Sequence, residues 1–506
     1  MAPCLEGCPV EIIESIVVLL EDITDVGNLR LTSKTLAWTV AAEGGRYRSL
    51  FKSTHVDVTE RRLRALEEVT RPGYLGCVIE DLTIVGVVNN TKGLETTLGW
   101  ETGNWPGEEG WLGEGTGHDQ PHHSCVEEGC SPERLARTVC DLEVLRRRHA
   151  EQEQLRNSGK DISLLSQAFH NLKQNGERGR LRSLSLQIVV YRKDTEQRLT
   201  PSFENGWKLV FRQAADTFEA TCHALSSTGL PIEKLDLFSQ LQCCSIPHDI
   251  LSRIVHDTDG LTASFVDLQD LSISLSDMLL KDEPRDRIGD AGDVYNCCDA
   301  DSDAEEYAPT WQSFWEDAAK EKNYTGLVDL LKLCPNLREL DVHHFRAQRA
   351  YDVRDDLQTE KLLQYVAQSA RLARLHTCKL RGLKVREKHL LAFLKQNCIR
   401  DLTLQNLSMI QGKDTFRSVF DFCTSEEADM QLLHFYQLFE PCGSDQVWFE
   451  ESSRPEVPTG EGGSGISNML KGAGVDVKQQ IVYHTLRPDS PPVWWQDERR
   501  KEYGPP

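Results

Sequence analysis

Long apolar runs are missing from this chain of 506 residues. No stretch approaches the roughly 18 to 20 apolar residues that a membrane-spanning helix needs. The longest apolar stretch near the start, Ile16 to Leu20, lies between Glu14 and Glu21 and follows no basic leader, so we predict no secretory signal. We therefore expect an intracellular protein, cytoplasmic, nuclear or both, that has no membrane partner.

Regular cysteine spacing is also missing, although the chain has 16 cysteines. No two of them form a C-x-x-C pair, and Cys243-Cys244 and Cys297-Cys298 are adjacent, which suits neither a disulfide framework nor a zinc framework. In a reducing compartment such cysteines are free thiols that behave as small buried apolar side chains.

The common catalytic and nucleotide-binding motifs are absent as well. The sequence has no Walker A motif, no G-x-S-x-G elbow and no H-E-x-x-H motif. The stretch Gly460 to Gly465 matches G-x-G-x-x-G, but it follows a Pro/Ser-rich coil and carries Glu461 where a pyrophosphate would lie. We predict no catalytic residue and no cofactor. An enzyme in an unrecognised α/β domain is the least favoured interpretation of this chain, after the two protein-binding interpretations given below.

Basic residues are few, since 57 Lys and Arg stand against 79 Asp and Glu and the formal net charge is −22. Two segments carry most of that excess: residues 99–131 hold seven acids and no Lys or Arg, and residues 282–306 hold ten acids beside Arg285 and Arg287. Such charge runs are typical of solvated loops, so both segments are predicted to be disordered inserts. An acidic chain also disfavours binding to a phosphate backbone, so no nucleic-acid partner is expected.

The first insert contains residue types that bind zinc, because imidazole and thiolate groups are ligands of that ion. They are His118, His122, His123, Cys125 and Cys130. Their spacing matches no closed structural zinc site, and the surrounding Gly and acidic residues favour a loop. We therefore predict no metal site.

The first fifty residues contain three short helical patterns. Pro9 suits the first position of a helix, and Glu11 places a negative charge in the first turn, where it favours the helix dipole. A second pattern runs from Ile23 to Leu29, and Thr32 or Ser33 can cap a third helix. The first pattern has an apolar stripe broader than one short neighbour would bury, made of Ile12, Ile13, Ile16, Val17, Leu19 and Leu20.

The segment from Cys8 to Ile16, followed by Leu29 to Lys34, resembles the F-box. The family pattern is a Leu-Pro-x-Glu-apolar-apolar helix and then Leu-Arg-x-Val-Ser-Lys, with Cys8 here in place of the preferred Leu. The match covers residues 7–45 and resembles the large F-box set of filamentous fungi. This resemblance implies a three-helix domain that binds the Skp adaptor of cullin–RING ubiquitin ligases. The residues implied in that contact are Pro9, Ile12, Ile16, Leu29, Leu31 and Ser33.

A motif of the form apolar-x-x-Leu-x-apolar (with Thr377 closing the sixth copy) begins seven times, at Ile79, Leu181, Ile232, Leu268, Leu337, Leu372 and Ile399. Its alternating part is typical of a short strand with one buried face, and an amphipathic helical stretch precedes each copy. One helix–strand unit cannot bury both faces, whereas stacked units share a continuous core. We predict an α/β solenoid of short parallel strands with helices on the outer face, similar to irregular leucine-rich repeats. A generic α/β domain with Leu-rich strands is the alternative.

The predicted organisation has five parts. They are an F-box at 7–45, a first helix–strand repeat at 46–98, a Gly/acidic disordered insert at 99–131, a leucine-rich-repeat-like body at 132–450 with the acidic insert 282–306, and a Gly/Pro-rich tail at 451–506. Trp494-Trp495 in the tail is expected either to pack on the last repeat or to have no specific role.

In a solenoid, the outward side chains of the strands form a broad platform that binds proteins without any catalytic residue. The candidates for substrate contact flank the core leucines and are Asp236, Asp270, Glu339, Asp341, Arg374, His376 and Asp401. We predict a substrate-recognition adaptor of a Skp–cullin–F-box E3 ubiquitin ligase, whose repeats bind an unknown protein substrate. The alternative is a leucine-rich-repeat interaction scaffold that engages no ligase.

Overall fold

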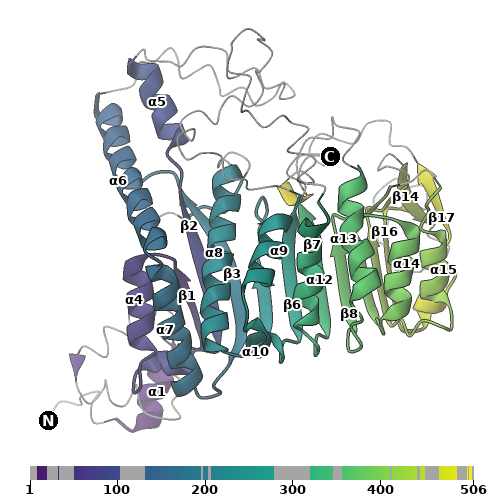
Figure 1. Cartoon of the computed structure of the whole chain (residues 1–506), viewed down its shortest axis with the longest axis horizontal. Coiled ribbons are helices and arrows are strands. Elements are labelled where there is room, and N and C mark those ends of the chain that lie inside the picture. The colour runs from purple at the N-terminus through teal and green to yellow at the C-terminus, as the bar shows by residue number, and fades with distance from the viewer. Residues whose placement is uncertain are drawn as a thin grey trace.

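The chain folds as a mixed α/β structure around one large, mostly parallel sheet (Figure 1). The computed structural model describes residues 8–19, 32–33, 51–102, 132–194, 198–202, 207–277, 320–345, 356–410, 413–440, 445–450, 466–486, 499 and 501–503. Several sequence predictions lie outside these residues, namely those on Leu29, Leu31, residues 103–131, the acidic insert 282–306 and Trp494-Trp495.

The main sheet has 11 strands in the order β1-β2-β3-β4-β6-β7-β8-β10-β12-β16, with β5 paired beside β6. Every neighbouring pair from β1 to β12 on this path is parallel, as predicted. These strands are β1 (Ser53–Asp57), β2 (Asp81–Asn89), β3 (Leu181–Tyr191), β4 (Ile232–Leu237), β5 (Ile246–Pro247), β6 (Asp270–Ser276), β7 (Glu339–Phe345), β8 (Thr377–Arg381), β10 (Asp401–Gln405), β12 (Leu432–Tyr436) and β16 (Met469–Ala473).

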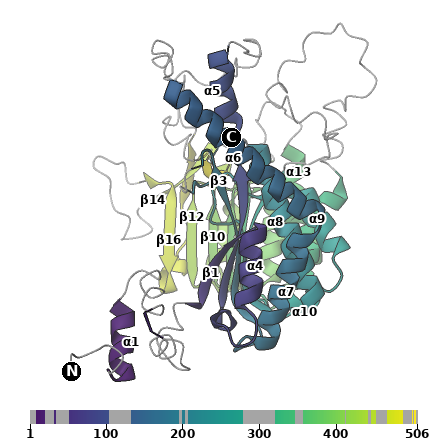
Figure 2. The ribbon, with the colours of Figure 1, turned by 90° about the vertical axis from the view of Figure 1, so that its left-hand side faces the viewer.

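A row of helices covers one face of this sheet, and most of them pack against the next helix along the row (Figure 2). They are α4 (Glu60–Val69), α7 (Lys160–Asn175), α8 (Trp207–Thr228), α9 (His248–Asp257), α10 (Leu261–Phe265), α12 (Thr325–Lys332), α13 (Asp356–Ser369), α14 (Glu387–Gln396) and α15 (Arg417–Thr424). The other described helices are α1 (Val10–Leu19), α5 (Lys92–Thr102), α6 (Pro132–Asn157) and the 3-10 turns η3 (Leu75–Val78), η8 (Glu321–Asn323) and η10 (Gly474–Lys478). Helix α5 therefore extends four residues beyond the expected end of the first repeat at residue 98.

Strand register explains why the leucine motif forms this sheet. Side chains alternate between the two faces of a strand, and in-register pairing brings equivalent positions of neighbouring strands side by side. One such row, on the helix-covered face, consists of Leu82, Leu184, Leu235, Leu271, Leu340, Cys378, Leu402 and Leu433. All of these residues are buried in one continuous core that also includes the inner sides of the helices.

The sequence places the sixth motif three residues too early, because the copy that aligns with the other strands begins at Leu375 instead of Leu372. The strand begins at Thr377, and Cys378 rather than Leu375 pairs in register with Leu402. Arg374 and His376, which we expected on the strand platform, lie instead in the connection between α13 and β8. A cysteine at a position that other copies fill with leucine concealed the true alignment.

The last three helix–strand units share a turn that the sequence did not predict. After β8, β10 and β12, the chain passes through one residue with positive φ, namely Gly382 (73°), Asn406 (52°) and Gln437 (52°). Glycine adopts this left-handed conformation freely and asparagine tolerates it, whereas glutamine is held there by its surroundings. Each turn leads into a two-residue strand of a second, six-stranded sheet, formed by β9 (Lys384–Val385), β11 (Ser408–Met409), β13 (Phe439–Glu440), β14 (Asp445–Glu450), β15 (Ile466–Ser467) and β17 (Tyr483–Leu486).

Part of the expected tail belongs to the folded body. Residues 469–473 form β16, which pairs antiparallel with β12 and ends the main sheet. Strand β17 pairs antiparallel with β14 in the second sheet. The boundary predicted at residue 451 therefore does not separate a folded body from a plain tail, because residues 466–486 cover the edge of the last parallel strand.

Candidate protein-binding surface

The side of the main sheet opposite the helix row, here called the strand face, carries mainly polar side chains. No described helix covers it in the way that the helix row covers the other side (Figure 2). Two in-register rows lie on this face, and their members are exposed or half-buried. The first row is Ser183, Lys234, Asp270, Glu339, Thr377, Asp401 and Leu432, and the second is Ser185, Asp236, Ser272, Asp341, Lys379, Thr403 and His434.

Three of the predicted platform residues are held by neighbours within the protein. Asp341 Oδ1 accepts a hydrogen bond from Arg381 Nε at 2.9 Å. Asp236 Oδ1 accepts one from the backbone N–H of Ser239 at 3.0 Å, and burial raises the pKa of the Asp236 carboxyl above its usual value. Asp270 forms an ion pair with Lys234 on the adjacent strand. These three carboxylates therefore hold neighbouring residues of the strand face in place, and they also contribute to its charge.

Two other predicted residues, Glu339 and Asp401, stay on the strand face as expected. Glu339 is exposed and Asp401 is half-buried. Thr377 lies between them in the same row, and Lys379 lies in the next row on the same strand. The exposed Lys379 and the 41% exposed Leu432 were not predicted, because their strands were misaligned or unrecognised in the sequence. The resulting patch has acidic, basic and apolar groups side by side. A protein partner matches such a mixed surface better than a nucleic acid, which requires mainly basic groups.

The N-terminal helix α1 presents a separate apolar residue to solvent. Its first turn is set by Pro9, whose carbonyl oxygen accepts from the N–H groups of Ile12 and Ile13 at 3.0 and 3.2 Å. Ile13 is 2% exposed, whereas Ile12 is 50% exposed. Of the other predicted adaptor-binding residues, Ile16 and Ser33 are half-buried and Pro9 is exposed.

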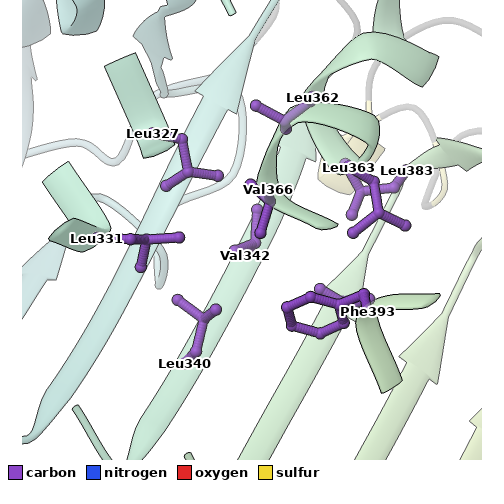
Figure 3. A pocket seen from close by; sticks show the side chains of 10 residues that line it. Leu327, Leu331, Leu340, Val342, Leu362, Leu363, Val366, Leu383 and Phe393 are labelled. Atoms are coloured by element: carbon purple, nitrogen blue, oxygen red, sulfur yellow. The ribbon is translucent and has the colours of Figure 1, made fainter. Parts of the chain in front are cut away.

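The interior offers no room for a small-molecule ligand in its two best-formed gaps. The first lies between α12, α13, α14 and the strands β7 and β8, and Figure 3 shows that its lining is apolar. It encloses about 10 Å³, the space of one water-sized sphere, and an apolar cavity of that size stays empty. It is a packing gap in the core.

The second gap, also of about 10 Å³, lies in a buried polar cluster between α6, α7 and α8. Arg156 Nη2 lies 2.7 Å from Asp216 Oδ2 outside hydrogen-bond alignment, and it also donates to Gln213 Oε1 at 3.1 Å. Burial raises the pKa of Asp216 to about 6, and the nearby Asp161 carboxyl also has a raised pKa because it is buried. The cluster has no space for a substrate, so we assign it a structural role.

We expect Asp216→Asn to stabilise the protein at pH 8 and to lose that advantage in acid. At pH 8 the carboxylate is ionised in both states, and its burial costs folding about 2 kcal/mol that the amide avoids. As the pH falls below about 6, the folded wild-type protein takes up the proton before the unfolded chain does, so the cost disappears towards pH 4. Urea unfolding at pH 8 and pH 4.5 measures the difference. The exposed Asp267→Asn is the control, and a pH-independent gain in Asp216→Asn would contradict the expectation.

Other site types find little support in the described residues. The ten described cysteines are free thiols, and six of them are buried. Within the described ranges, no three His, Cys, Asp or Glu side chains gather closely enough to hold a metal ion. None of the described helices is both long and apolar enough to cross a membrane. No protein-family model matches the chain, and no curated protein matches it.

Proposed function

We propose that this chain is a substrate-recognition adaptor of a Skp–cullin–F-box E3 ubiquitin ligase. In this proposal the N-terminal F-box binds the Skp adaptor, and the stacked helix–strand units are irregular leucine-rich repeats that bind a protein substrate. The observation that carries the substrate-binding part is the strand face. There, seven parallel strands in register, from β3 to β12 in the main sheet, leave two rows of mainly polar side chains on the side opposite the helix row. Such an extended, rigid face binds another protein over a large area.

The adaptor-binding part is supported by the sequence resemblance and by helix α1. A helix that buries Ile13 but leaves Ile12 half exposed offers an apolar anchor to a partner. Burying an isoleucine side chain of this kind contributes about 1.5 to 3 kcal/mol. The ligase role then requires no proton-transfer residue in this chain, because the scaffold brings the substrate close to the ubiquitin-carrying enzyme and supplies catalysis by proximity.

The first test is co-purification of the full chain with the Skp adaptor. We expect the wild-type chain to bind, and we expect Ile12→Asp combined with Leu31→Asp to weaken binding at least about 30-fold, as loss of a hot-spot anchor worth about 2 kcal/mol does. Val475→Asp is the matched control, because Val475 is 87% exposed in η10 at the other end of the molecule.

The outcomes separate the ligase adaptor from the alternative scaffold. If the folded wild-type chain does not bind the Skp adaptor, the ligase proposal fails and the strand face serves a scaffold of another kind. If Val475→Asp loses binding as strongly as the double variant, the contact does not run through the F-box. Circular dichroism of all variants establishes that the compared proteins are folded.

A further inference from the structure

The end of the chain returns to the carboxyl edge of the main sheet. Arg499 and Lys501–Tyr503 have helical backbone, and they contact residues in or just after strands whose carboxyl ends meet there. We call these residues the C-terminal turn. The surface that they contact, here called the carboxyl-edge groove, is formed by Cys243, His343, Gly382, Asn406 and Phe439.

Two backbone carbonyls hold the C-terminal turn in the groove. The N–H of Cys243 donates to the carbonyl oxygen of Lys501 at 3.2 Å. His343 Nε2 lies 2.8 Å from the carbonyl oxygen of Glu502. Every residue of a peptide carries a carbonyl oxygen. These two contacts therefore bind a peptide backbone in the groove regardless of its side chains.

Two side chains of the C-terminal turn provide the specific contacts. Arg499 Nε donates to Asn406 Oδ1 at 3.0 Å, and its guanidinium carbon lies 5.4 Å from the centre of the Phe439 ring. Tyr503 is 4% exposed, and its ring centre lies 5.4 Å from that of His343. Arg499 and Tyr503 are four residues apart, so one helical turn presents both on the same side.

The glycine at the centre of the groove leaves room for the tyrosine ring. A Cβ atom on Gly382 would lie 2.7 Å from Tyr503 Cδ1 and 2.3 Å from the carbonyl oxygen of His344. Its φ of 73° is also a conformation that favours glycine. Any larger residue at position 382 would therefore overlap both the Tyr503 ring and the neighbouring backbone.

His343 shows that the C-terminal turn covers part of the strand face. It pairs in register with Arg381, so it points away from the helix row, yet it is only 1% exposed. Its Nδ1 lies 2.8 Å from Ser274 Oγ, and its Nε2 faces Glu502. Burial lowers the pKa of His343 to about 3, so the ring is neutral, and the network assigns the proton to Nε2, which donates to the Glu502 carbonyl.

We propose that the carboxyl-edge groove is a recognition site for a short helical peptide that carries arginine and, four residues later, an aromatic residue, and that the C-terminal turn is its resting occupant. A partner peptide of this chemistry reproduces the carbonyl, guanidinium and aromatic contacts and displaces the turn. The side chain of Lys501 is exposed, so its position in the motif is free to vary. The inference deepens the proposed function by naming a substrate class, and it rests on that function only in calling the peptide a substrate.

The test uses a fluorescein-labelled peptide with the sequence of residues 497–506 and measures its fluorescence anisotropy with purified protein. We expect the chain that ends at Asp497 to bind this peptide at least ten times more tightly than the full chain, whose groove is occupied. In the peptide, Tyr503→Ala or Arg499→Ala should weaken binding at least tenfold, and Lys501→Ala, the matched control, less than twofold. The full chain with Arg499→Ala and Tyr503→Ala should also gain binding, without any shortening.

Three results would overturn the proposal. A shortened chain that melts cooperatively but binds no peptide would show that the groove does not recognise one in trans. Equal binding by the full and shortened chains would place the peptide elsewhere on the protein. Loss of folding in both the shortened chain and the double variant would make the C-terminal turn an integral part of the core. No Skp adaptor is present in this measurement. A negative result here would therefore overturn the peptide-binding proposal and leave the ligase proposal untouched.

Discussion

Phe420→Ala should lower the free energy of unfolding by about 4 kcal/mol, which is typical of deleting a large, fully buried aromatic side chain. Phe420 is 1% exposed in α15, and four aromatic rings surround it. The ring centres of Phe435 and Tyr483 lie 5.1 Å from its own, and those of Phe416 and Phe449 lie 5.7 Å away. These rings come from β12, β14, β17 and the start of α15. The substitution therefore leaves a cavity where α15 packs against both sheets.

The control for this effect is Phe422→Ala, two residues along the same helix. Phe422 is only half-buried, and Lys395 Nζ lies 5.6 Å from the centre of its ring. We expect this substitution to cost about 1 kcal/mol. Urea unfolding measures both losses, and equal losses would contradict the packing described here.

We also expect Phe420→Ala to destabilise one part of the chain more than the rest. In a stack of units, each unit is stabilised mainly by its neighbours, so the damage should be largest at the C-terminal end. Hydrogen exchange should accelerate in residues 417–486 of Phe420→Ala and stay slow in β2 and β3, the central strands of the first units. Uniform acceleration would indicate that the whole sheet unfolds as one cooperative body.

The sequence predicted the parallel sheet well because its signal is local. A strand with one buried face needs apolar residues at alternate positions, and Leu184 and Leu186 satisfy this within three residues. The same rule missed β12, where Leu433 and Phe435 occupy the equivalent positions. It misaligned β8 because Cys378, a small apolar residue, takes the place of leucine.

The remaining features depend on contacts between distant segments, which periodicity does not encode. Strand β16 pairs with β12 although β13, β14 and β15 lie between them in the chain, and no apolar–polar alternation in Met469–Ala473 predicts that pairing. The carboxyl-edge groove is the clearest case, since Asn406 meets Arg499 and His343 meets Glu502. Arg499 lies within the segment predicted as a Gly/Pro-rich tail, because the residues that it contacts are distant from it in the sequence. The platform acids were placed correctly where the motif alignment was correct.

Gly326→Ala should lower the free energy of unfolding by about 3 kcal/mol, because a small side chain there meets backbone atoms that have no room to withdraw. Gly326 is the second residue of α12, where this helix crosses α9. A Cβ atom at this position would lie 2.5 Å from the backbone nitrogen of Ser252 and 2.6 Å from its Cα. The N–H of Gly326 also donates to Ser252 Oγ at 3.0 Å, and Ser252 Oγ donates to the carbonyl oxygen of Asn323 at the same distance. Relieving the overlap would separate the helices and break this pair of hydrogen bonds.

Gly93→Ala is the matched control, because Gly93 is the second residue of α5 and a Cβ atom there would meet nothing within 4 Å. Alanine has the higher helix propensity, so this substitution should raise the free energy of unfolding by up to about 1 kcal/mol. The same chemical change at the same helical position is therefore expected to have opposite signs, and urea unfolding of the two variants measures the difference. A loss in both would trace the effect to the helix start itself, whereas opposite signs trace it to the contact between α9 and α12. That contact sets the spacing of the helices behind β6 and β7, and hence the alignment of Asp270 with Glu339 on the strand face.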